Sequence, residues 1–296
     1  MIIIQRSDGA TRHAIVTGAA GGLGRAFCRL LARDGWRIAI VDIDQAGAEQ
    51  TRNEIVEAGG SGQVEICDVT SAADWRSLRD RLRGDWRRLD LLVNNAGMFG
   101  SGFVGALDLD AAERVMRLNL LGTLVGCDTM APWLVESAAE TARTRGEARA
   151  DQQPIAAAPH IINVASAFAH FCPPGMGVYS ASKAAVVALS ETLYGELRPR
   201  GVGVTVVCPG VMPTGFIRDA AFDSPAYQRL TESYVRNSTL APEAVAAAAL
   251  RGMRRGELYV VEGARERWFW RLKRLLPTHF LRRVARQVRK DLKAQA

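Results

Sequence analysis

Short apolar runs alternate with stretches of helical periodicity along most of this 296-residue chain. The apolar runs are continuous rather than interleaved with polar residues, which is typical of strands covered on both faces in a parallel sheet. They lie at residues 13–17, 37–41, 63–67, 89–93, 160–165, 203–208 and 257–261. Apolar residues recur every three or four positions in the stretches between them, at 23–31, 45–58, 72–83, 109–136, 179–197 and 242–254. This alternation predicts one doubly wound, Rossmann-type α/β domain over residues 1–263, with a parallel seven-stranded sheet.

Three segments stand apart from this pattern. Residues 137–159 hold eight alanines and mixed charges, and Ile155 is their one large apolar side chain. Because such a stretch buries too little apolar surface to offset its ordering entropy, we expect a mobile surface insertion there. Residues 212–240 carry Met and aromatic side chains and are expected to form a substrate loop. Residues 264–296 are a basic helical extension.

The composition is that of an ordinary globular protein, with 48% hydrophobic and 23% charged residues. No apolar run approaches the roughly 18–20 residues of a membrane-spanning helix, and the first residues do not resemble a signal peptide. The five cysteines are scattered and form no CxxC pair, so neither a disulfide framework nor a metal site is predicted. We therefore expect a reduced, cytoplasmic protein.

The net charge of +7 is concentrated at the end of the chain. Residues 264–296 contain eleven Lys or Arg and two Asp or Glu, which gives this extension +9 and leaves the rest of the chain at −2. A nucleic-acid-binding domain needs basic residues gathered on its folded surface. No nucleic-acid partner is therefore expected.

A glycine-rich turn joins the first predicted strand to the first predicted helix. It reads TGAAGGLG at 17–24 and lacks the literal GxGxxG pattern, because position 27 is Phe. Gly18 permits the tight turn, Gly22 lets the backbone approach a pyrophosphate, and Gly24 lets the helix pack close to the strand. The helix N-terminus then offers free N–H groups and a positive dipole end to phosphates.

Asp42 ends the second predicted strand, eighteen residues after Gly24. A carboxylate at about this place can hydrogen-bond the adenosine ribose and repel a 2′-phosphate. Ile43 follows it, and Gly21 stands where a basic residue could contact that phosphate, so NAD is predicted over NADP. The alternative is that Asp42 only caps a turn, with Asp44 as the N-cap of the next helix.

Tyr179 and Lys183 lie four residues apart and therefore share one face of a predicted helix. Ser166 ends an apolar strand thirteen residues before the tyrosine, and Asn95 follows another strand. Asn119 lies in the helix behind that strand. Because the carboxyl ends of parallel strands share one crevice, these side chains and the glycine-rich turn are expected to meet there.

The order and spacing of these motifs resemble those of the short-chain dehydrogenase/reductase family over about residues 10–262. The matching motifs are TGxxxGxG at 17–24, Asp68-Val69, NNAG at 94–97, Asn119, Ser166, YxxxK at 179–183 and Pro209-Gly210 leading to Thr214. The resemblance implies an oxidoreductase in which Tyr179 is the general acid/base. It further implies that the Lys183 ammonium and the positive nicotinamide of NAD⁺ lower the Tyr179 pKa.

The resemblance also assigns roles to the other site residues. Lys183 would hold the nicotinamide ribose, Ser166 would donate a hydrogen bond to the carbonyl oxygen, and Asn119 would fix a proton-relay water. Within the cofactor site, Asp68 and Val69 would contact the adenine and Thr214 the carboxamide. The implied cofactor-binding set is Thr17, Gly18, Gly22, Leu23, Gly24, Asp42, Asp68, Val69, Asn95, Ala96, Gly97, Tyr179, Lys183, Pro209, Gly210 and Thr214.

The expected substrate is a hydrophobic alcohol or its ketone or aldehyde, because many apolar side chains follow the catalytic motifs. They are Met212, Phe216, Ile217, Phe222, Tyr227 and Tyr234 in the substrate loop, with Phe168, Phe171 and Met176 beside the serine and tyrosine. His170 either meets a polar end of the substrate or is merely partly exposed in its loop. Two other functions stay open. They are a non-catalytic NAD-binding regulatory protein of the same fold, and an epimerase or dehydratase using the same triad.

The basic extension contains two amphipathic stretches separated by Pro277. Helical spacing relates Ala264, Trp268, Leu272 and Leu276, and likewise Leu281, Val284, Val288 and Leu292. Such helices either dock on the enzyme body or a partner subunit, or make peripheral contact with an anionic bilayer. Since the extension follows the strand region through which many relatives form tetramers, a homodimer through the long helices is expected instead.

Overall fold

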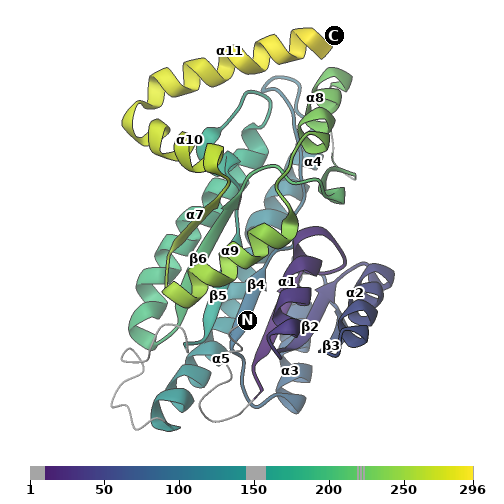
Figure 1. Ribbon diagram of the computed structural model, residues 1–296, viewed down its shortest axis with the longest axis vertical. Coiled ribbons are helices and arrows are strands. Elements are labelled where there is room, and N and C mark those ends of the chain that lie inside the picture. The colour runs from purple at the N-terminus through teal and green to yellow at the C-terminus, as the bar shows by residue number, and fades with distance from the viewer. Residues whose placement is uncertain (1–10, 145–157, 219, 221, 223, 296) are drawn as a thin grey trace.

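One seven-stranded parallel sheet organises the protein (Figure 1). The computed structural model describes residues 11–144, 158–218, 220, 222 and 224–295. The strands are β1 (His13–Thr17), β2 (Arg37–Asp42), β3 (Ser61–Ile66), β4 (Leu91–Asn94), β5 (His160–Val164), β6 (Gly203–Pro209) and β7 (Tyr259–Glu262). Their order, β3-β2-β1-β4-β5-β6-β7, confirms the predicted doubly wound fold. The order reverses between β1 and β4, which is where such sheets open a ligand crevice.

Helices cover both faces of the sheet. On one face lie α1 (Gly22–Arg33), α2 (Gln45–Glu57) and α9 (Pro242–Arg255), and on the other lie α3 (Ala72–Asp85), α5 (Gly122–Thr144) and α7 (Gly177–Leu197). Two cores result, because each strand points alternate side chains to opposite faces. Ile38 and Ile40 of β2 belong to the first core, and Ala39 and Val41 belong to the second.

The remaining helices are short or lie at one end of the sheet. They are α4 (Leu109–Met116), the π-helical turn η1 (Arg117–Leu121), α6 (Phe168–Phe171), α8 (Pro225–Arg236), α10 (Ala264–Leu275) and α11 (Pro277–Gln295), with 3₁₀ turns η4 (Arg198–Arg200) and η5 (Gly215–Ile217). The continuous helix Leu109–Thr144 is long and apolar enough to span a membrane by length and composition. Half of its most apolar window is buried inside the protein, which is the behaviour of a core helix.

The predicted mobile insertion at 137–159 is wrong in its first part, because α5 runs on to Thr144. Ser137, Ala138, Thr141 and Ala142 are buried there. Small side chains let the helix pack closely, and their hydroxyls find partners: Ser137 accepts from the Leu89 amide at 3.1 Å, and Thr141 accepts from Arg88 at 2.9 Å. The rest of that segment, 145–157, lies outside the described residues.

The basic extension forms two helices that dock on the body of the protein. Helix α10 packs against α6 and β7, and α11 packs against α8 (Figure 1). The predicted buried stripe of α10 is only partly right. Phe269 and Trp270 face the body together with Leu272, whereas Trp268 and Leu276 are exposed. The aromatic rings decide the orientation, since Phe269 meets Phe171 with ring centroids 5.4 Å apart.

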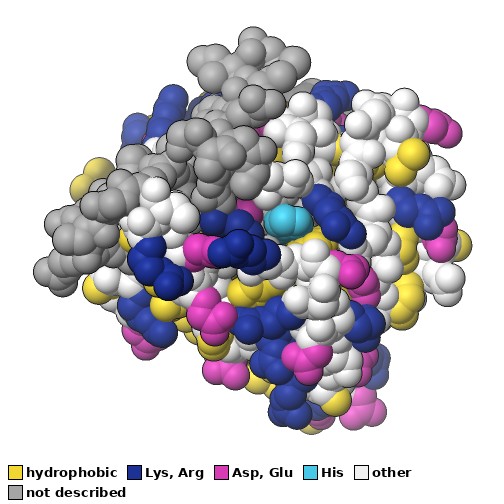
Figure 2. All heavy atoms as spheres, turned by 90° about the horizontal axis from the view of Figure 1, so that it is seen from below, with side chains coloured by type: hydrophobic (Ala, Val, Ile, Leu, Met, Phe, Trp, Pro, Cys, Tyr) yellow, Lys and Arg dark blue, Asp and Glu magenta, His cyan; other side chains and the backbone are white. Residues whose placement is uncertain are grey.

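Charge is mixed on the opposite end of the molecule. Figure 2 views the protein from below, away from α10 and α11, and the visible side chains there include Lys or Arg interspersed with Asp or Glu. No single sign dominates the part of this face that grey atoms leave uncovered. This distribution agrees with a nearly neutral body that carries a basic extension at one end.

Candidate active site

The glycine-rich turn brings β1 and α1 into very close approach. A Cβ at Gly24 would lie 2.1 Å from the carbonyl oxygen of Gly18, and Gly18 itself has φ +62°. No side chain caps the N-terminus of α1, where Gly21 is the N-cap and the first turn is without acidic residues. The first N–H groups of α1 therefore remain available to an anion, and the backbone fits a dinucleotide pyrophosphate.

A hydrogen-bond network holds this turn against the end of β4. The Thr17 hydroxyl accepts from the amides of Asn95 and Ala96, each at 3.0 Å. The Asn95 side chain donates to the carbonyls of Thr17 at 2.9 Å and Gly18 at 3.1 Å. The NNAG segment thus fixes the shape of the turn from the neighbouring strand.

Asp42 points its carboxylate back toward the turn. One oxygen accepts from the Ala20 amide at 2.9 Å and the other from the Asp44 amide at 3.0 Å. Asp44 is the N-cap of α2, where its side chain accepts from the Gly47 amide at 3.1 Å. Asp42 therefore caps a turn and at the same time lies beside the nucleotide-binding backbone.

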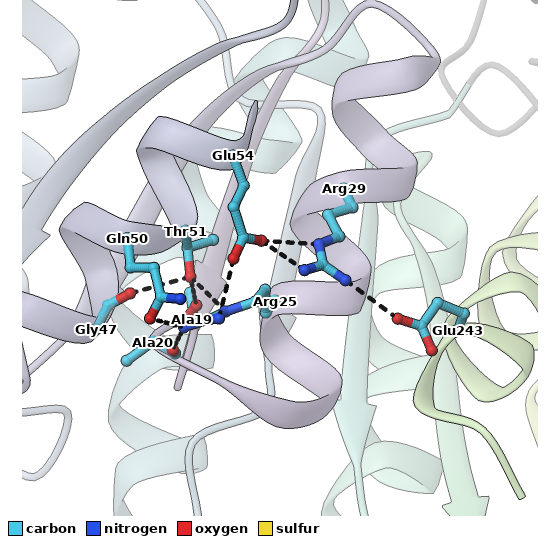
Figure 3. Close-up of polar contacts among 9 residues, drawn as sticks. All are labelled: Ala19, Ala20, Arg25, Arg29, Gly47, Gln50, Thr51, Glu54 and Glu243. Carbon is cyan, nitrogen blue, oxygen red and sulfur yellow. Dashed lines mark hydrogen bonds and ion pairs between the residues drawn. The ribbon is translucent and has the colours of Figure 1, made fainter. Parts of the chain in front are cut away.

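Arg25, on α1 next to the turn, is committed to neighbours on α2 (Figure 3). Its guanidinium donates to Glu54 at 3.1 Å and to the Thr51 hydroxyl at 3.0 Å. It also donates to Gln50 at 3.2 Å and to the carbonyl of Ala20. This arginine links the glycine-rich turn to α2, because its guanidinium already donates to these groups.

Tyr179 lies in the first turn of α7, close to Ser166 at the end of β5. Both side chains are 5% exposed. Burial raises the pKa of Tyr179 to about 12, and a hydrogen bond with Ser166 opposes that rise. The sequence resemblance implies a lowered Tyr179 pKa, whereas the structure raises it. The reason is that the loss of hydration on burial outweighs the hydrogen bond with Ser166.

Lys183 lies one turn further along α7 and is also buried. Its ammonium donates to the Val164 carbonyl at 3.0 Å, and burial lowers its pKa to about 8. Gly97 makes room for it, since a Cβ there would lie 3.2 Å from Lys183 Nζ and 2.9 Å from Asn119 Oδ1. The NNAG segment, Asn119 and Lys183 therefore converge at one point.

Asn119 is held by the π-helical turn between α4 and α5. Its side chain accepts from the Met98 amide at 2.8 Å and donates to the Ser182 hydroxyl at 2.9 Å. Ser182 donates in turn to the Tyr179 carbonyl at 2.8 Å. Asn119 thus ties the start of α7 to the segment that follows β4. Its own backbone carbonyl accepts from Thr123 at 2.9 Å.

The remaining cofactor candidates lie around the same edge of the sheet. Thr214 approaches the turn, because a Cβ at Gly22 would lie 3.4 Å from the Thr214 Cβ. Pro209 ends β6, and its carbonyl accepts from the Ala167 amide at 2.8 Å beside Ser166. Asp68 is exposed, while its neighbour Val69 is buried.

An apolar cluster surrounds Tyr179, which we call the Tyr179 cluster. Its buried members are Phe99, Met176, Tyr179, Tyr227 and Val288, with Phe168, Ile217, Ala220, Phe222, Val284 and Leu292 partly buried against them. The rings of Phe99, Phe216 and Phe168 have centroids 5.1, 6.2 and 6.4 Å from that of Tyr179. The Tyr179 ring is therefore surrounded by apolar and aromatic side chains.

Two residues expected at the site face elsewhere. His170 lies with its ring centroid 6.1 Å from that of Trp270 in α10, and its pKa falls to about 4 through burial and the nearby Lys273 and Arg274. Tyr234 donates to Asp291 of α11 at 2.7 Å. Both contacts involve the C-terminal helices, whose position the sequence pattern did not specify.

Several site residues have no counterpart in the sequence expectations. Ser182 lies inside the YxxxK motif, and Phe99 follows NNAG by two residues, so their positions offered a signal. The buried pair Asn94 and Asn163 joins β4 to β5 at 2.9 Å, and Asn163 also donates to Ser190 of α7 at 3.0 Å. These contacts fix the strand ends on which the site is built.

Comparison with known proteins identifies the family. A family model described as enoyl-(acyl carrier protein) reductase matches residues 18–251. D-threitol dehydrogenase of Mycolicibacterium smegmatis is 31% identical over 245 residues, which cover 83% of this chain and 86% of that protein. The chain belongs to the short-chain dehydrogenase/reductase family.

A second relative is much longer than this chain. The probable oxidoreductase EphD of Mycobacterium tuberculosis is 33% identical over 210 residues, or 71% of this chain. Those residues are 32% of EphD, so the chain matches about a third of that protein's length.

Solved structures share the fold. A short-chain dehydrogenase/reductase from Burkholderia phymatum in complex with NAD superposes with a TM-score of 0.79 at 28% identity, covering 89% of this chain and 93% of that one. A short-chain dehydrogenase from Sphingobium yanoikuyae in complex with NADPH gives 0.67 at 26% identity, covering 87% and 91%. A nicotinamide cofactor is thus supported for the fold and the family.

Proposed function

We propose that this protein interconverts a hydrophobic alcohol and its ketone or aldehyde with NAD as hydride carrier. The observation that carries the proposal is the convergence of Ser166, Tyr179 and Lys183, all buried, at the strand edge that also holds the uncapped N-terminus of α1. The bound nicotinamide would supply the hydride acceptor and a positive charge. The residues of the chain supply the proton transfer and the orientation.

Tyr179 is the proposed general acid/base. During oxidation the phenolate oxygen would take the proton of the alcohol, and Ser166 would donate a hydrogen bond to the same oxygen of the substrate. Burial alone disfavours the phenolate. A positive charge nearby favours it, which gives Lys183 and the oxidised cofactor their electrostatic role. Asn119 and Ser182 act through position, because they hold the backbone of Tyr179.

The preference for NAD rests on Asp42 and Arg25. The Asp42 carboxylate lies beside the Ala20 amide, where it would accept from ribose hydroxyls and repel a 2′-phosphate. Arg25 is the arginine next to this turn, and its donors are engaged by Glu54, Thr51, Gln50 and Ala20 (Figure 3). A 2′-phosphate would therefore find a carboxylate in place of a free guanidinium.

The apolar Tyr179 cluster favours a hydrophobic substrate. Apolar and aromatic side chains surround the Tyr179 ring in this cluster, so an alkyl substituent placed against them would gain from apolar burial. D-threitol dehydrogenase is named for a polyol, and this chain is proposed to differ from it in substrate.

Two alternative functions make different predictions. A non-catalytic NAD-binding regulatory protein would bind NADH and turn over no alcohol. An epimerase or dehydratase would convert its substrate without net formation of NADH. The buried Ser166, Tyr179 and Lys183 favour the oxidoreductase over the regulatory protein.

The test of the proposed function is replacement of Tyr179 by Phe. We expect Tyr179→Phe to lower the turnover of secondary alcohols by at least about 100-fold, the usual worth of general acid–base catalysis, while NADH still binds. In the unmodified enzyme, oxidation should accelerate as pH rises, since the phenolate is the proton acceptor. This rising limb should disappear in the Phe variant.

Tyr194→Phe is the matched control. Tyr194 lies on the same helix, but it packs against the core between the sheet and the α3–α5 face rather than in the Tyr179 cluster. The variant should leave both the rate and the pH profile unchanged. Turnover in Tyr179→Phe equal to that of the unmodified protein would overturn the catalytic assignment.

We also propose peripheral contact of the α10–α11 junction with an anionic membrane. Val284, Val288 and Leu292 of the predicted α11 stripe pack against the body, whereas Leu281 of that stripe is 37% exposed. Trp268, Leu275 and Leu276 are between 51% and 77% exposed around the junction. Exposed cations flank them, namely Arg271, Arg274, Arg282, Arg283 and Arg286. Apolar side chains rimmed by arginines suit the headgroup region of a bilayer containing anionic lipid.

The membrane contact is tested by co-sedimentation with phosphatidylcholine vesicles with and without phosphatidylserine. The full chain should sediment with the anionic vesicles at low salt and release at high salt, because the attraction is screened. Changing Leu275 and Leu276 to Ser should abolish sedimentation, whereas Val56→Ser, an equally exposed apolar position on α2, should not. A full-length protein that stays in the supernatant at low salt contradicts the proposal.

A cytoplasmic homodimer completes the proposed function. The described residues include five free cysteines and no disulfide, which suits a reducing compartment.

A further inference from the structure

Helix α11 takes part in the apolar cluster around the proposed catalytic tyrosine. Val288 is 8% exposed and belongs to the same buried group as Tyr179, Phe99, Met176 and Tyr227. Val284 and Leu292, one turn to either side, pack against this group. The extension that follows β7 therefore reaches back to the site at the carboxyl edge of the sheet (Figure 1).

Two separate anchors hold α11 in this place. Near its start, Phe280 is 4% exposed and packs with Ala167, which directly follows Ser166, and with Phe171 of α6. The Phe280 and Phe171 ring centroids are 6.0 Å apart.

The second anchor lies near the other end of α11. Asp291 accepts from the Tyr234 hydroxyl of α8 at 2.7 Å and from Gln287 of α11 at 2.7 Å. The first anchor ties α11 to the catalytic serine segment and the second ties it to the helix of the substrate loop. The stretch of α11 between the two anchors contains Val284 and Val288, which pack in the Tyr179 cluster.

We propose that α11 forms a wall of the substrate site and that Val288 limits the size of the apolar substituent that the enzyme accepts. This inference rests on the proposed function, in which the phenol of Tyr179 contacts the reacting oxygen of the alcohol. With that oxygen fixed, the carbon substituents of the alcohol must extend into the surrounding side chains of the Tyr179 cluster. The side chains of this cluster come from the segment after β4, from α6 and the start of α7, from the substrate loop with α8, and from α11.

The substrate class follows from this wall. A substituent that replaces water against Val284, Val288, Phe99 and Phe222 gains from apolar burial, and each added methylene improves the fit until the wall is reached. Secondary alcohols with a linear or branched alkyl chain are therefore preferred over polyols. Chain length is limited where α11 closes the space.

The experiment compares Val288→Ala and Val288→Trp across a ladder of alkan-2-ols from 2-butanol to 2-decanol, with NAD⁺ as the oxidant. One methylene in an apolar pocket changes kcat/KM by roughly 10–200-fold. We expect Val288→Ala to raise the ratio of kcat/KM for the longest accepted alcohol to that for 2-butanol by about tenfold. Val288→Trp should lower the same ratio by at least as much. Leu281→Ala is the control, because Leu281 lies on the same helix but is exposed.

The measured ratio separates specificity from stability, because a loss of folded enzyme lowers both rates equally. NADH binding should be unchanged in all three variants, since α11 carries no proposed cofactor residue. An unmodified enzyme that oxidises no alcohol of the ladder, nor reduces the corresponding ketones, would refute the proposed function itself. A different outcome is that the variants Val288→Ala, Val288→Trp and Leu281→Ala are all active with the same chain-length profile. That result would overturn the proposal that α11 limits the substrate, and it would leave the proposed function intact.

Discussion

At the scale of single residues, burial is the dominant influence on the site. It raises the pKa of Tyr179 to about 12 and lowers that of Lys183 to about 8, so each group is pushed toward its neutral form. Each unit of pKa corresponds to about 1.4 kcal/mol. The positive charge of a bound oxidised nicotinamide would oppose this cost for Tyr179. We infer that proton transfer is coupled to cofactor binding, because the two charges stabilise each other only when both are present.

The proposed preference for NAD depends on one residue, Asp42. Asp42→Ala removes the carboxylate that would accept from the ribose and repel a 2′-phosphate. A hydrogen bond to a charged group is worth about 1.5–3 kcal/mol, so the ratio of kcat/KM for NAD⁺ to that for NADP⁺ should fall at least about tenfold. Steady-state kinetics with both cofactors and one alcohol measure this ratio.

Asp44→Ala is the control for that measurement, because Asp44 caps α2 two residues further on. Loss of the cap should cost about 1 kcal/mol of stability and lower Tm, with the cofactor ratio unchanged. If the unmodified enzyme already prefers NADP⁺ tenfold, Asp42 does not select the cofactor in the proposed way.

At the scale of elements, the chain's periodicity predicted the sheet well. The apolar runs of β1, β2, β5 and β6 are buried on both faces, so their strand character does not depend on distant partners. The predicted run 89–93 became a strand at Leu91–Asn94, because register pairing with β1 and β5 begins at Leu91 and Asn94 pairs with Asn163. Such shifts arise from pairing, which periodicity does not contain.

Elements whose burial depends on distant segments were harder to predict. The sequence of the last turns of α5 offers little apolar surface to bury, so it did not predict a packed helix. In the structure, Arg88 and the Leu89 amide donate hydrogen bonds to the buried hydroxyls of Thr141 and Ser137. In α10, heptad-like spacing favoured Trp268, whereas pairing with Phe171 selects Phe269. Tertiary contacts decide both cases, and neither partner is near in sequence.

The candidate site shows the same division. Some motif residues could be located from spacing, because Ser166 and Asn95 follow strand ends and Tyr179 and Lys183 share a helix turn, whereas the others came from the family resemblance. The Tyr179 cluster could not be, since it joins Phe99, Met176, Tyr227 and Val288 from segments up to 189 positions apart in the printed numbering. The part that α11 takes in this cluster could not be predicted, because it depends on the packing of the end of the chain against α8 and the segment after β5.

At the scale of the whole molecule, the surface of the long helices favours self-association. Leu109, Leu121 and Leu124 are exposed along α4, η1 and α5. An open hollow of about 390 Å³ lies between α4 and the start of α7, and its lining includes Val104, Met116 and Glu113. Apolar side chains around a hollow on one face suit a two-fold interface, in which each subunit presents the same patch to its partner.

We therefore predict a homodimer that depends on this face. Sedimentation velocity at micromolar concentration should give about twice the 32.1 kDa mass of the chain. Changing Leu121 and Leu124 to Glu should yield monomers, because two buried carboxylates per subunit would face the same groups across the two-fold axis. Val56→Glu, at an exposed apolar position on α2, should leave the dimer intact.

The same measurement distinguishes this face from the C-terminal helices as the place of assembly. If the Leu121 and Leu124 variant remains dimeric while Leu275→Glu with Leu276→Glu is monomeric, the subunits meet through the α10–α11 junction. That junction would then be covered in solution, and the proposed membrane contact would fail with it. A dimer lost only by the long-helix variant leaves the junction free, because the two surfaces carry separate sets of exposed side chains.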